Sequence, residues 1–137
     1  MIFLEPKILY RIAEEEVPLE DFEIPLSKAE VIKEGKDLTV ISYGTQLRQV
    51  RMAVDKLEKE RSGLQIEIID LRTIIPYDAE TVANSVRKTG RALVTHEAPQ
   101  TGGFAAELIA SISENCFDHL EAPVQRVCGY DTPFPLS

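Results

Sequence analysis

The sequence has no tryptophan, only two cysteines and no long hydrophobic run. No apolar run approaches the roughly 20 residues that cross a bilayer, so no membrane-spanning helix is expected. Cys116 and Cys128 lack CxxC spacing and lie in segments expected to be buried, which argues against a metal site or a disulfide framework. Acidic residues outnumber basic ones, 23 to 15, and the net charge is −8. Nucleic acid is therefore not an expected partner, because phosphate binding needs a basic surface.

The 137 residues suffice for one domain with a hydrophobic core. Residues 1–28 contain Pro6, Pro18 and Pro25 without a sustained period, which predicts an extended linker arm rather than a regular helix. The apolar residues of this arm require a docking surface, on this domain or on another. Residues 29–137 are expected to form an α/β domain, and the pattern at both ends predicts a truncated fragment of a longer chain.

From residue 29 onward, strands with apolar centres alternate with segments that have apolar residues at helical spacing. This alternation predicts an α/β fold with a mainly parallel sheet flanked by helices on both faces. The first strand is joined to the second by a link too short for a crossover, so it is expected to be antiparallel or off the sheet. The predicted strands are 29–35, 37–44, 65–71, 91–99 and 123–130, and the predicted helices are 45–63, 78–90 and 102–117.

Capping residues are expected at the helix ends. Thr45 and Asp78 can accept hydrogen bonds from the first-turn N–H groups of their helices. Gly63 and Gly90 can end the same two helices in a left-handed conformation. The apolar stripes expected to face the sheet are Leu47, Val50, Val54 and Leu57 in the first helix and Phe104, Leu108, Ile112 and Cys116 in the last.

His96 and Glu97 lie at the carboxyl end of a predicted parallel strand, where open α/β sheets place their ligands. A general acid/base pair is conceivable at this position. Neighbouring strand residues point in opposite directions, however, so these two side chains are not expected to act on one atom. The favoured interpretation is that one of them caps or pairs locally while the other faces a subunit contact.

Thr101, Gly102 and Gly103 precede a predicted helix and could present backbone N–H groups to a phosphate or a carboxylate. Neither a GxGxxG nor a GxxxxGK[ST] motif accompanies them, so a tight turn that brings the helix close to the sheet is favoured. Two alternative functions remain open on this reading. One is a free-standing small α/β enzyme that uses His96, Glu97 and the Gly102–Gly103 turn, and the other is an anion-binding module that rests on that turn alone.

Other polar groups suggest no complete catalytic site. Asp70 and Arg72 could clamp a charged ligand, or could form an ion pair within the domain or with a neighbouring subunit. Ser42 lacks the GxSxG context of a nucleophile elbow. His119 follows a helix in a polar stretch and is interpreted as a solvated helix end. The residues taken alone therefore lead to an α/β domain without an assigned reaction.

The chain resembles a known family in five segments: FLEPKILYR, VISYGTQ, IDLRTIIPYD, KTGRALVTHEAPQTGGFAAEL and EAPVQRVCGYDTPFP. They are similar to the C-terminal domain of the beta subunit of branched-chain 2-oxo acid dehydrogenase, a thiamine-dependent decarboxylating component. The resemblance covers residues 3–136 and implies a transketolase C-terminal-like fold. The pyruvate-specific subunit is similar in DLRTI, whereas IIPYD, THEAP and CGYDTPFP favour the branched-chain family.

The resemblance implies an oxidoreductase of branched-chain amino acid catabolism. The full α2β2 enzyme of that family oxidatively decarboxylates branched-chain 2-oxo acids with thiamine diphosphate and Mg, and passes the acyl group to a lipoyl-bearing acyltransferase. Its cofactor and its catalytic residues lie outside this domain. The resemblance therefore implies no catalytic, cofactor-binding or metal residue in this chain, no catalytic role for His96, and no activity of the fragment alone.

The implied partners are an alpha subunit, a second beta subunit and the subunit-binding domain of the dihydrolipoyl acyltransferase core. In related complexes an acidic residue just before an Ala-Pro pair contacts basic groups on that small domain, and Glu121 holds this position here. An acidic patch can steer a basic partner. Glu121 can equally be a solvated loop carboxylate. The RVCGYDTPFP segment implies the mitochondrial matrix of a eukaryote rather than a bacterial cytoplasm.

Overall fold

The structure is a computed structural model that describes residues 2–133. Within that range the strands are β1 (Glu30–Lys33), β2 (Leu38–Ser42), β3 (Ile66–Asp70), β4 (Ala92–Pro99) and β5 (Gln125–Gly129). They form one sheet in the order β1-β3-β2-β4-β5. β1 pairs with β3 in the antiparallel direction, as the short link after it predicted, and the other pairings are parallel.

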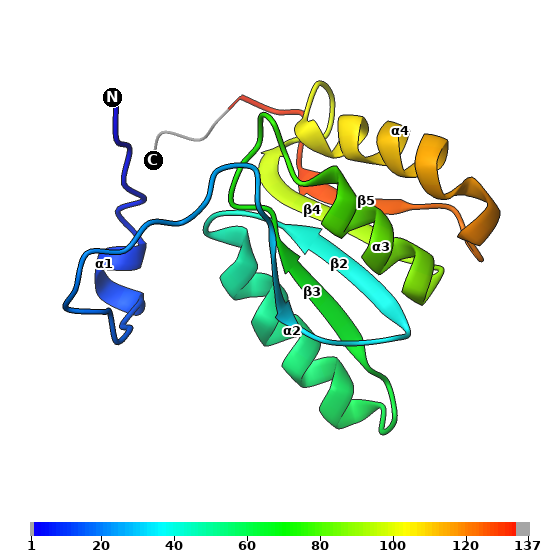
Figure 1. The fold of residues 1–137 in the computed structure, drawn as a ribbon, viewed down its shortest axis with the longest axis horizontal. Helices are drawn as coiled ribbons and strands as arrows, with labels where there is room; N and C mark the ends of the chain where they lie inside the picture. The colour runs from blue at the N-terminus through cyan, green and yellow to red at the C-terminus, as the bar shows by residue number, and fades with distance from the viewer. Residues whose placement is uncertain (1, 134–137) are drawn as a thin grey trace.

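Helices cover both faces of this sheet (Figure 1). α2 (Gln46–Glu60) packs on one face, and α3 (Ala79–Thr89) and α4 (Phe104–Cys116) pack on the other. α4 runs directly into a short 3-10 helix, η1 (Phe117–His119). None of the described helices is long and apolar enough to cross a membrane. The α/β fold predicted from the sequence, a mainly parallel sheet between two helical layers, is confirmed.

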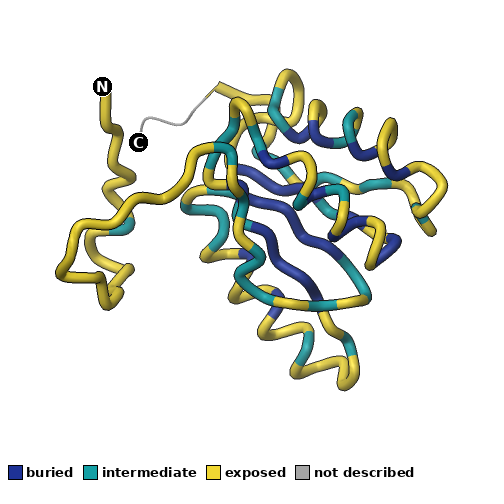
Figure 2. Tube along the Cα trace, in the orientation of Figure 1, coloured by how far each residue is buried: buried dark blue, intermediate teal, exposed yellow. Residues whose placement is uncertain are grey.

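Two apolar cores form because successive side chains of a strand point to opposite faces of the sheet. In β3, Ile68 packs with residues of α2, whereas Ile69 packs with residues of α3 and α4. The middle of the sheet is accordingly buried (Figure 2). The core under α2 consists of Val40, Val50, Val54, Ile66 and Ile68, and the core under α3 and α4 includes Ile41, Ile69, Val86, Val94, Leu108, Ile112 and Cys116.

The stripe predicted for α4 is confirmed at Leu108, Ile112 and Cys116, each at most 2% exposed. The stripe predicted for α2 is confirmed in its middle, where Val50 and Val54 are buried. Leu57, in the last turn of α2, is 40% exposed. The helical period therefore identified the inward faces but did not show how far along each helix the core extends.

The predicted ends of α3 are confirmed. Asp78 accepts a hydrogen bond from the backbone N–H of Thr81 at 3.1 Å, which satisfies one of the free donors of the first turn. Gly90 follows the last turn with φ 68°, in the left-handed region that glycine enters without steric cost.

The predicted cap of α2 is wrong. Thr45 has a helical backbone and makes no side-chain cap, because its hydroxyl donates instead to the Oε2 atom of Glu97 at 2.6 Å. The end of the helix also differs from the prediction: α2 stops at Glu60, and Gly63, with φ 92°, lies in the turn that follows. A tertiary contact from β4 thus replaces the local cap.

The N-terminal arm is largely extended, but the expectation that it holds no helix is wrong. Residues Leu9–Ile12 form one helical turn, α1, between the prolines. The guanidinium of Arg48 on α2 donates to the carbonyl of Ile12 at 2.7 Å. The apolar side chains of the arm nevertheless remain mostly exposed, and they are Ile2, Phe3, Leu4, Ile8, Tyr10, Val17, Leu19, Phe22, Ile24 and Leu26.

Candidate functional site

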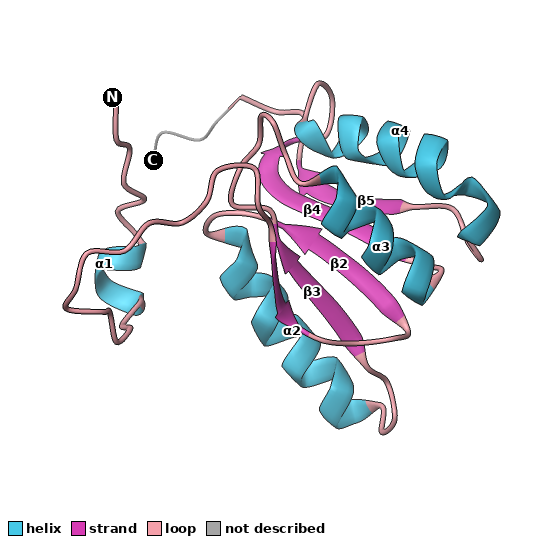
Figure 3. Cartoon of the chain, in the orientation of Figure 1, coloured by secondary structure: helices cyan, strands magenta, loops and turns pink. Residues whose placement is uncertain are grey.

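The candidate residues lie at two opposite edges of the parallel sheet. The carboxyl edge carries His96 at the end of β4 and Asp70 at the end of β3, and the loops that follow these strands lie at the same edge (Figure 3). Glu121 lies at the amino edge, where its backbone N–H donates to the carbonyl of Gly90, just before β4 begins. His96 and Glu121 therefore cannot belong to one site.

His96 is 1% exposed and points toward α4. Its Nδ1 atom lies 3.0 Å from the carbonyl oxygen of Ala98, and its Nε2 atom accepts a hydrogen bond from the backbone N–H of Ala105 at 3.1 Å. A carbonyl only accepts and an N–H only donates, so Nδ1 carries the ring proton and Nε2 is the acceptor. Both nitrogens are thus occupied by the chain itself, and the lone pair of a general base is not free.

Glu97 points to the opposite face of the sheet from His96. Its carboxylate accepts from Thr45 at the start of α2, and the preceding Thr95 accepts from Gln46 at 3.2 Å. The prediction that neighbouring side chains diverge at this strand end is confirmed. His96 and Glu97 do not form an acid/base pair, and each one pairs locally with a different helix.

The Gly102–Gly103 turn brings α4 close to β4. A Cβ atom on Gly103 would lie 2.4 Å from the carbonyl oxygen of Pro99 and 2.6 Å from the Cε1 atom of His96, so no larger residue fits without a shift. Gly102 has φ 71°, in the left-handed region. The tight-turn interpretation of this segment is therefore confirmed.

Backbone N–H groups of this turn are already hydrogen-bonded within the chain. The N–H of Thr101 donates to Asp131 at 2.9 Å, and the hydroxyl of Thr101 donates to the other oxygen of that carboxylate at 2.7 Å. The N–H of Gly103 donates to Gln100, and that of Ala105 donates to His96. An anion would have to displace these bonds, so the geometry does not favour an anion-binding module here.

The side chains around His96 are protonated and neutral, so none of them is an activated nucleophile. The Sγ atom of Cys128 lies 3.7 Å from Nε2, and the ring of Tyr43 lies 6.0 Å from the imidazole, centroid to centroid. Burial raises the pKa of the Cys128 thiol. Burial also raises the pKa of Tyr43, and repulsion from the Cys128 thiolate, where that forms, raises it further. Ser42 donates its hydroxyl to the carbonyl of Thr95 at 3.0 Å. No activated nucleophile follows from this arrangement.

Arg72 forms an ion pair with Glu30 of β1, within the same domain. Its backbone N–H donates to the Oδ1 atom of Asp70 at 3.0 Å, and its own φ is 55°. Burial raises the pKa of Asp70 despite that hydrogen bond and the nearby guanidinium. Of the two roles considered for Asp70 and Arg72, the intradomain ion pair is confirmed for Arg72, and it ties the antiparallel edge strand to the end of β3.

Glu121 pairs with Arg91 at 2.5 Å on the surface of the amino edge. The two side chains are 58% and 52% exposed, respectively, so solvent screens their attraction. The side chain of Glu121 also rests against Gly90, where an added Cβ atom would lie 2.9 Å from Cγ of Glu121. The carboxylate is accessible, and its proposed role toward a partner stays a prediction.

Glu67 is a buried charged residue that was not predicted from the sequence. It is the second residue of β3 and is 1% exposed. It accepts from the hydroxyl of Ser85, from the ammonium of Lys88 and from the backbone N–H of Gly35, the last at 3.2 Å. Burial by itself raises the pKa of this carboxyl, but the hydrogen bonds from Lys88, Ser85 and Gly35 outweigh it and hold the pKa below 4.5. A glutamate inside a continuous apolar strand is the signal that could have identified it.

A chain of hydroxyl groups extends this polar cluster between the sheet and α3. The hydroxyl of Thr39 lies 2.7 Å from that of Ser85 and 2.7 Å from that of Thr89. These hydroxyl groups are buried beside Glu67 and hydrogen-bond to one another, so none of them is left without the partner that a buried polar group needs. Its residues lie far from the carboxyl edge, and within residues 2–133 no three His, Cys, Asp or Glu residues gather as metal ligands.

Comparisons with known proteins agree with this architecture. A family model described as the transketolase C-terminal domain matches residues 27–137. The mitochondrial 2-oxoisovalerate dehydrogenase subunit beta of Dictyostelium discoideum is 62% identical over 136 residues, which cover 99% of this chain and 36% of that protein. The pyruvate dehydrogenase E1 component subunit beta of Acholeplasma laidlawii is 50% identical over 137 residues, which cover 100% of this chain and 41% of that protein. The chain therefore spans less than half the length of these relatives.

Among solved structures, a split gene transketolase described as an inactive beta4 tetramer superimposes with a TM-score of 0.67 at 28% identity. The match covers 86% of this chain and 37% of that one. The match of the family model to most of the chain, together with the parallel sheet and its two helical layers, shows that the chain belongs to the transketolase C-terminal domain family.

Proposed function

We propose that this chain is the C-terminal domain of the beta subunit of a branched-chain 2-oxo acid dehydrogenase. The observation that carries the proposal is sequence identity of 62%, 57% and 53% to three proteins named 2-oxoisovalerate dehydrogenase beta subunits, along nearly the whole chain. The full enzyme would oxidatively decarboxylate branched-chain 2-oxo acids and pass the acyl group to a lipoyl-bearing acyltransferase. A pyruvate dehydrogenase subunit at 50% identity makes pyruvate the competing substrate to test.

The role of this domain in that enzyme is assembly rather than chemistry. Its one buried histidine already uses both ring nitrogens within the chain, so it offers no free base. Thiamine diphosphate and Mg would be held by other parts of the enzyme. The described residues of this chain do not suit that cofactor, since the N–H groups of Thr101, Gly103 and Ala105 are occupied and residues 2–133 contain no cluster of metal-ligating side chains.

The partners in this proposal are an alpha subunit and a second beta subunit in an α2β2 assembly. Two features support an assembly role for this chain. The arm leaves a series of apolar side chains exposed, among them Phe3 at 81% and Leu19 at 102%, and such a series is typical of a surface covered by a partner. The related split gene transketolase is described as a beta4 tetramer, so a relative with this fold does self-associate.

Glu121 is proposed as a contact for the subunit-binding domain of the dihydrolipoyl acyltransferase. Its carboxylate is exposed and held only by a solvent-screened pair with Arg91, which a basic group of a partner can replace at little cost. The proposed compartment is the mitochondrial matrix, because the three similar beta subunits from eukaryotes carry mitochondrial names.

The proposal is tested with the full-length beta chain that contains this domain, assembled with its alpha partner. Decarboxylation of 3-methyl-2-oxobutanoate and of pyruvate would be measured for the wild type, His96→Gln and Glu97→Gln. We expect a higher kcat/KM for the branched substrate and near-normal turnover in both variants. A preference for pyruvate would overturn the substrate assignment. Loss of turnover in an intact tetramer with cofactor bound would overturn the assembly role.

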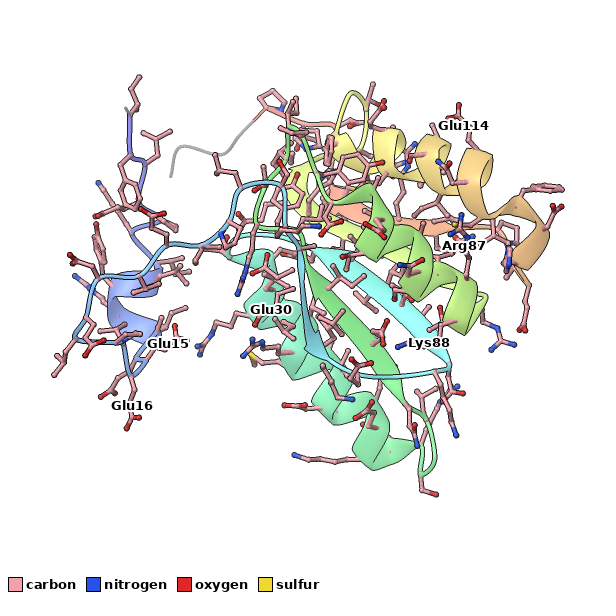
Figure 4. The ribbon with its side chains drawn as sticks, viewed as in Figure 1. Glu15, Glu16, Glu30, Arg87, Lys88 and Glu114 are labelled. Atoms are coloured by element: carbon pink, nitrogen blue, oxygen red, sulfur yellow. The ribbon has the colours of Figure 1, made fainter. Side chains whose placement is uncertain are left out.

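The contact at Glu121 needs a separate binding measurement. Affinity of the assembled enzyme for the acyltransferase subunit-binding domain would be compared for Glu121→Gln and for the matched control Glu114→Gln on the exposed face of α4 (Figure 4). We expect weaker binding, with a reduced salt dependence, only for Glu121→Gln. Equal affinities of the two variants would remove Glu121 from the interface.

A further inference from the structure

We propose that His96 is a pH-sensitive cap of α4: the neutral imidazole holds the first turn of that helix, and protonation of the ring releases it. The proposal goes beyond the assembly function and does not depend on it. It rests on the two hydrogen bonds of His96, on its burial and on the close approach of the Gly103 backbone.

A single tautomer satisfies both bonds of the imidazole. Nδ1 donates to the carbonyl of Ala98, two residues along β4, and this bond fixes the orientation of the ring. Nε2 is then left with a lone pair, directed at the N–H of Ala105 in the first turn of α4. That N–H is one of the helix donors that have no partner within the helix. Gly103, at the N-cap, supplies no capping side chain, so His96 does so from the sheet.

Protonation would convert this contact from attraction into repulsion. Nε2 would then carry a hydrogen that faces the N–H of Ala105, and the cap would lose its acceptor. The positive end of the helix dipole would face a new positive charge. Because His96 is 1% exposed, water cannot solvate that charge unless the turn opens. The imidazolium is therefore incompatible with the closed turn.

The groups in contact with the ring do not offset a positive charge. Cys128 of β5 and Tyr43 after β2 are both neutral at neutral pH, since burial raises the pKa of each. Phe104 contributes an apolar ring from α4, packed edge-on against Tyr43 at 6.4 Å between centroids. No anion stands ready among these contacts to form an ion pair with the protonated ring.

Charged groups of the surrounding elements have other partners or are exposed. Glu97 faces the α2 side of the sheet and accepts from Thr45. Asp131 holds Thr101 in the turn before α4, and Arg126 of β5 donates to the carbonyl of Gln100 at 3.2 Å. Glu107 is exposed in the first turn of α4. These groups shape the turn from outside, and both ring nitrogens of His96 are hydrogen-bonded to the backbone instead.

Release of the turn would alter a groove at the carboxyl edge. A groove of about 680 Å³ is lined by Gly103 and Phe104 at the start of α4 and by Pro76 and Tyr77 of the loop after β3. Tyr77 is packed edge-on against Phe104 at 5.8 Å between ring centroids. A change in the first turn of α4 therefore reaches both segments that line the groove. Acidification would change its shape while the sheet below stays folded.

Amide hydrogen exchange tests the cap. The chain has only two histidines, and the second one, His119, is exposed on η1, so its substitution serves as the control. Protection factors would be measured by NMR at about pH 8 and about pH 5.5 for the wild type, His96→Gln and the control His119→Gln. Glutamine at position 96 keeps a neutral acceptor. The amide of Ile41 in β2 reports global opening.

In the wild type and in His119→Gln, the protection factor of the Ala105 amide is expected to fall at least about tenfold at the lower pH, while that of Ile41 is unchanged. His96→Gln is expected to show no such loss. The proposal is overturned if the protection of Ala105 is independent of pH in the wild type, or equally dependent on pH in His96→Gln.

A measurement on the unmodified chain keeps the proposal testable if the variant does not fold. Long-range proton–nitrogen NMR correlations of the His96 ring identify its tautomer. We expect a proton on Nδ1 at about pH 8 and, on acidification, a titration that the amide resonance of Ala105 follows. A proton on Nε2 at high pH, or an amide of Ala105 that does not respond, contradicts the cap.

Discussion

Lys88 donates to the carboxylate of Glu67 across a boundary between water and core: the side chain of Lys88 is 44% exposed, whereas that of Glu67 is 1% exposed. The same ammonium also reaches Glu34, between β1 and β2, at 2.9 Å. α3, β3 and the link between β1 and β2 therefore meet at one cation. The hydrogen bonds that Lys88 donates to Glu67 and Glu34 raise the pKa of its ammonium, so it stays charged throughout the physiological range.

Lys88→Met is expected to destabilise the domain, because it leaves the buried carboxylate of Glu67 without its cation. Roughly 3–5 kcal/mol is typical when a fully buried pair loses one partner, and the half-exposed ammonium lowers the expectation to about 2 kcal/mol. Urea denaturation would measure the change. Lys56→Met, which removes an exposed pair with Glu60 at 3.9 Å, is the control, and an equal cost in both variants would contradict the role of Lys88.

Stability is expected to fall in acid because the fold lowers the pKa of several carboxyl groups, among them those of Glu67 and Asp78. Burial raises the pKa of Asp78, but hydrogen bonds from Thr81 and Ala29 and the charge of Lys28 lower it below 3.8 overall, as the bonds of Glu67 lower its pKa below 4.5. A lowered folded-state pKa means that the unfolded chain binds protons first. The stabilisation is complete above pH 4.5 and is lost as pH falls through the lowered values.

Urea midpoints at neutral pH, at about pH 4.5 and at lower pH would check this dependence. Asp78→Asn is expected to be less stable at neutral pH and to lose less stability in acid, since one of the carboxyl groups with a lowered pKa no longer titrates. Asp70 acts in the opposite direction because burial raises its pKa, so Asp70→Asn should make the acid loss steeper. Identical acid profiles for all three proteins would contradict this prediction.

Gly103→Ala is expected to destabilise the domain by about 2 kcal/mol or more, because the new methyl group would overlap Pro99 and His96. The matched control is Gly44→Ala. Gly44 has φ 64° and open space around its Cβ position, so alanine there adds only the left-handed backbone strain of about 1 kcal/mol. Thermal or urea unfolding would compare them. A Gly103→Ala variant as stable as Gly44→Ala would show that α4 can move away from β4.

Leu108→Ala and Leu57→Ala test how far the two helices contribute to the core. Leu108, on the sheet-facing side of α4, is 0% exposed. Its truncation is expected to cost about 2–5 kcal/mol through lost burial and the cavity left behind. Leu57 is 40% exposed, so its truncation should cost less than about 1 kcal/mol. Similar values in urea denaturation would contradict this description of the cores.

Local signals predicted the elements well. Continuous apolar centres located the strands of the sheet, and helical spacing identified Val54 and Leu108 as inward-facing residues. Asp78 and Gly90 act at the ends of α3 as their residue types predict. These features depend on neighbours within a few positions in the chain, so the local sequence contains the physical cause of each one.

Thr45 shows where local reasoning fails. Its residue type suits a helix cap, yet its hydroxyl bonds to Glu97, 52 positions away. The one-turn helix in the arm and the exposure of Leu57 were also not predicted, because both depend on what lies nearby in space. A propensity describes what a side chain can do alone, and a tertiary partner decides which option is used.

The sequence by itself determined the class of fold, the positions of the strands and helices, and the divergence of His96 and Glu97 at a strand end, since all of these follow from the period of two or of 3.6 residues. Only the tertiary structure decided that His96 caps α4 and that Glu67 is buried beside Lys88. These contacts join residues of different elements, 9 and 21 positions apart. Their energies depend on burial and on hydrogen-bond geometry, which exist only once the sheet and the helices have packed together.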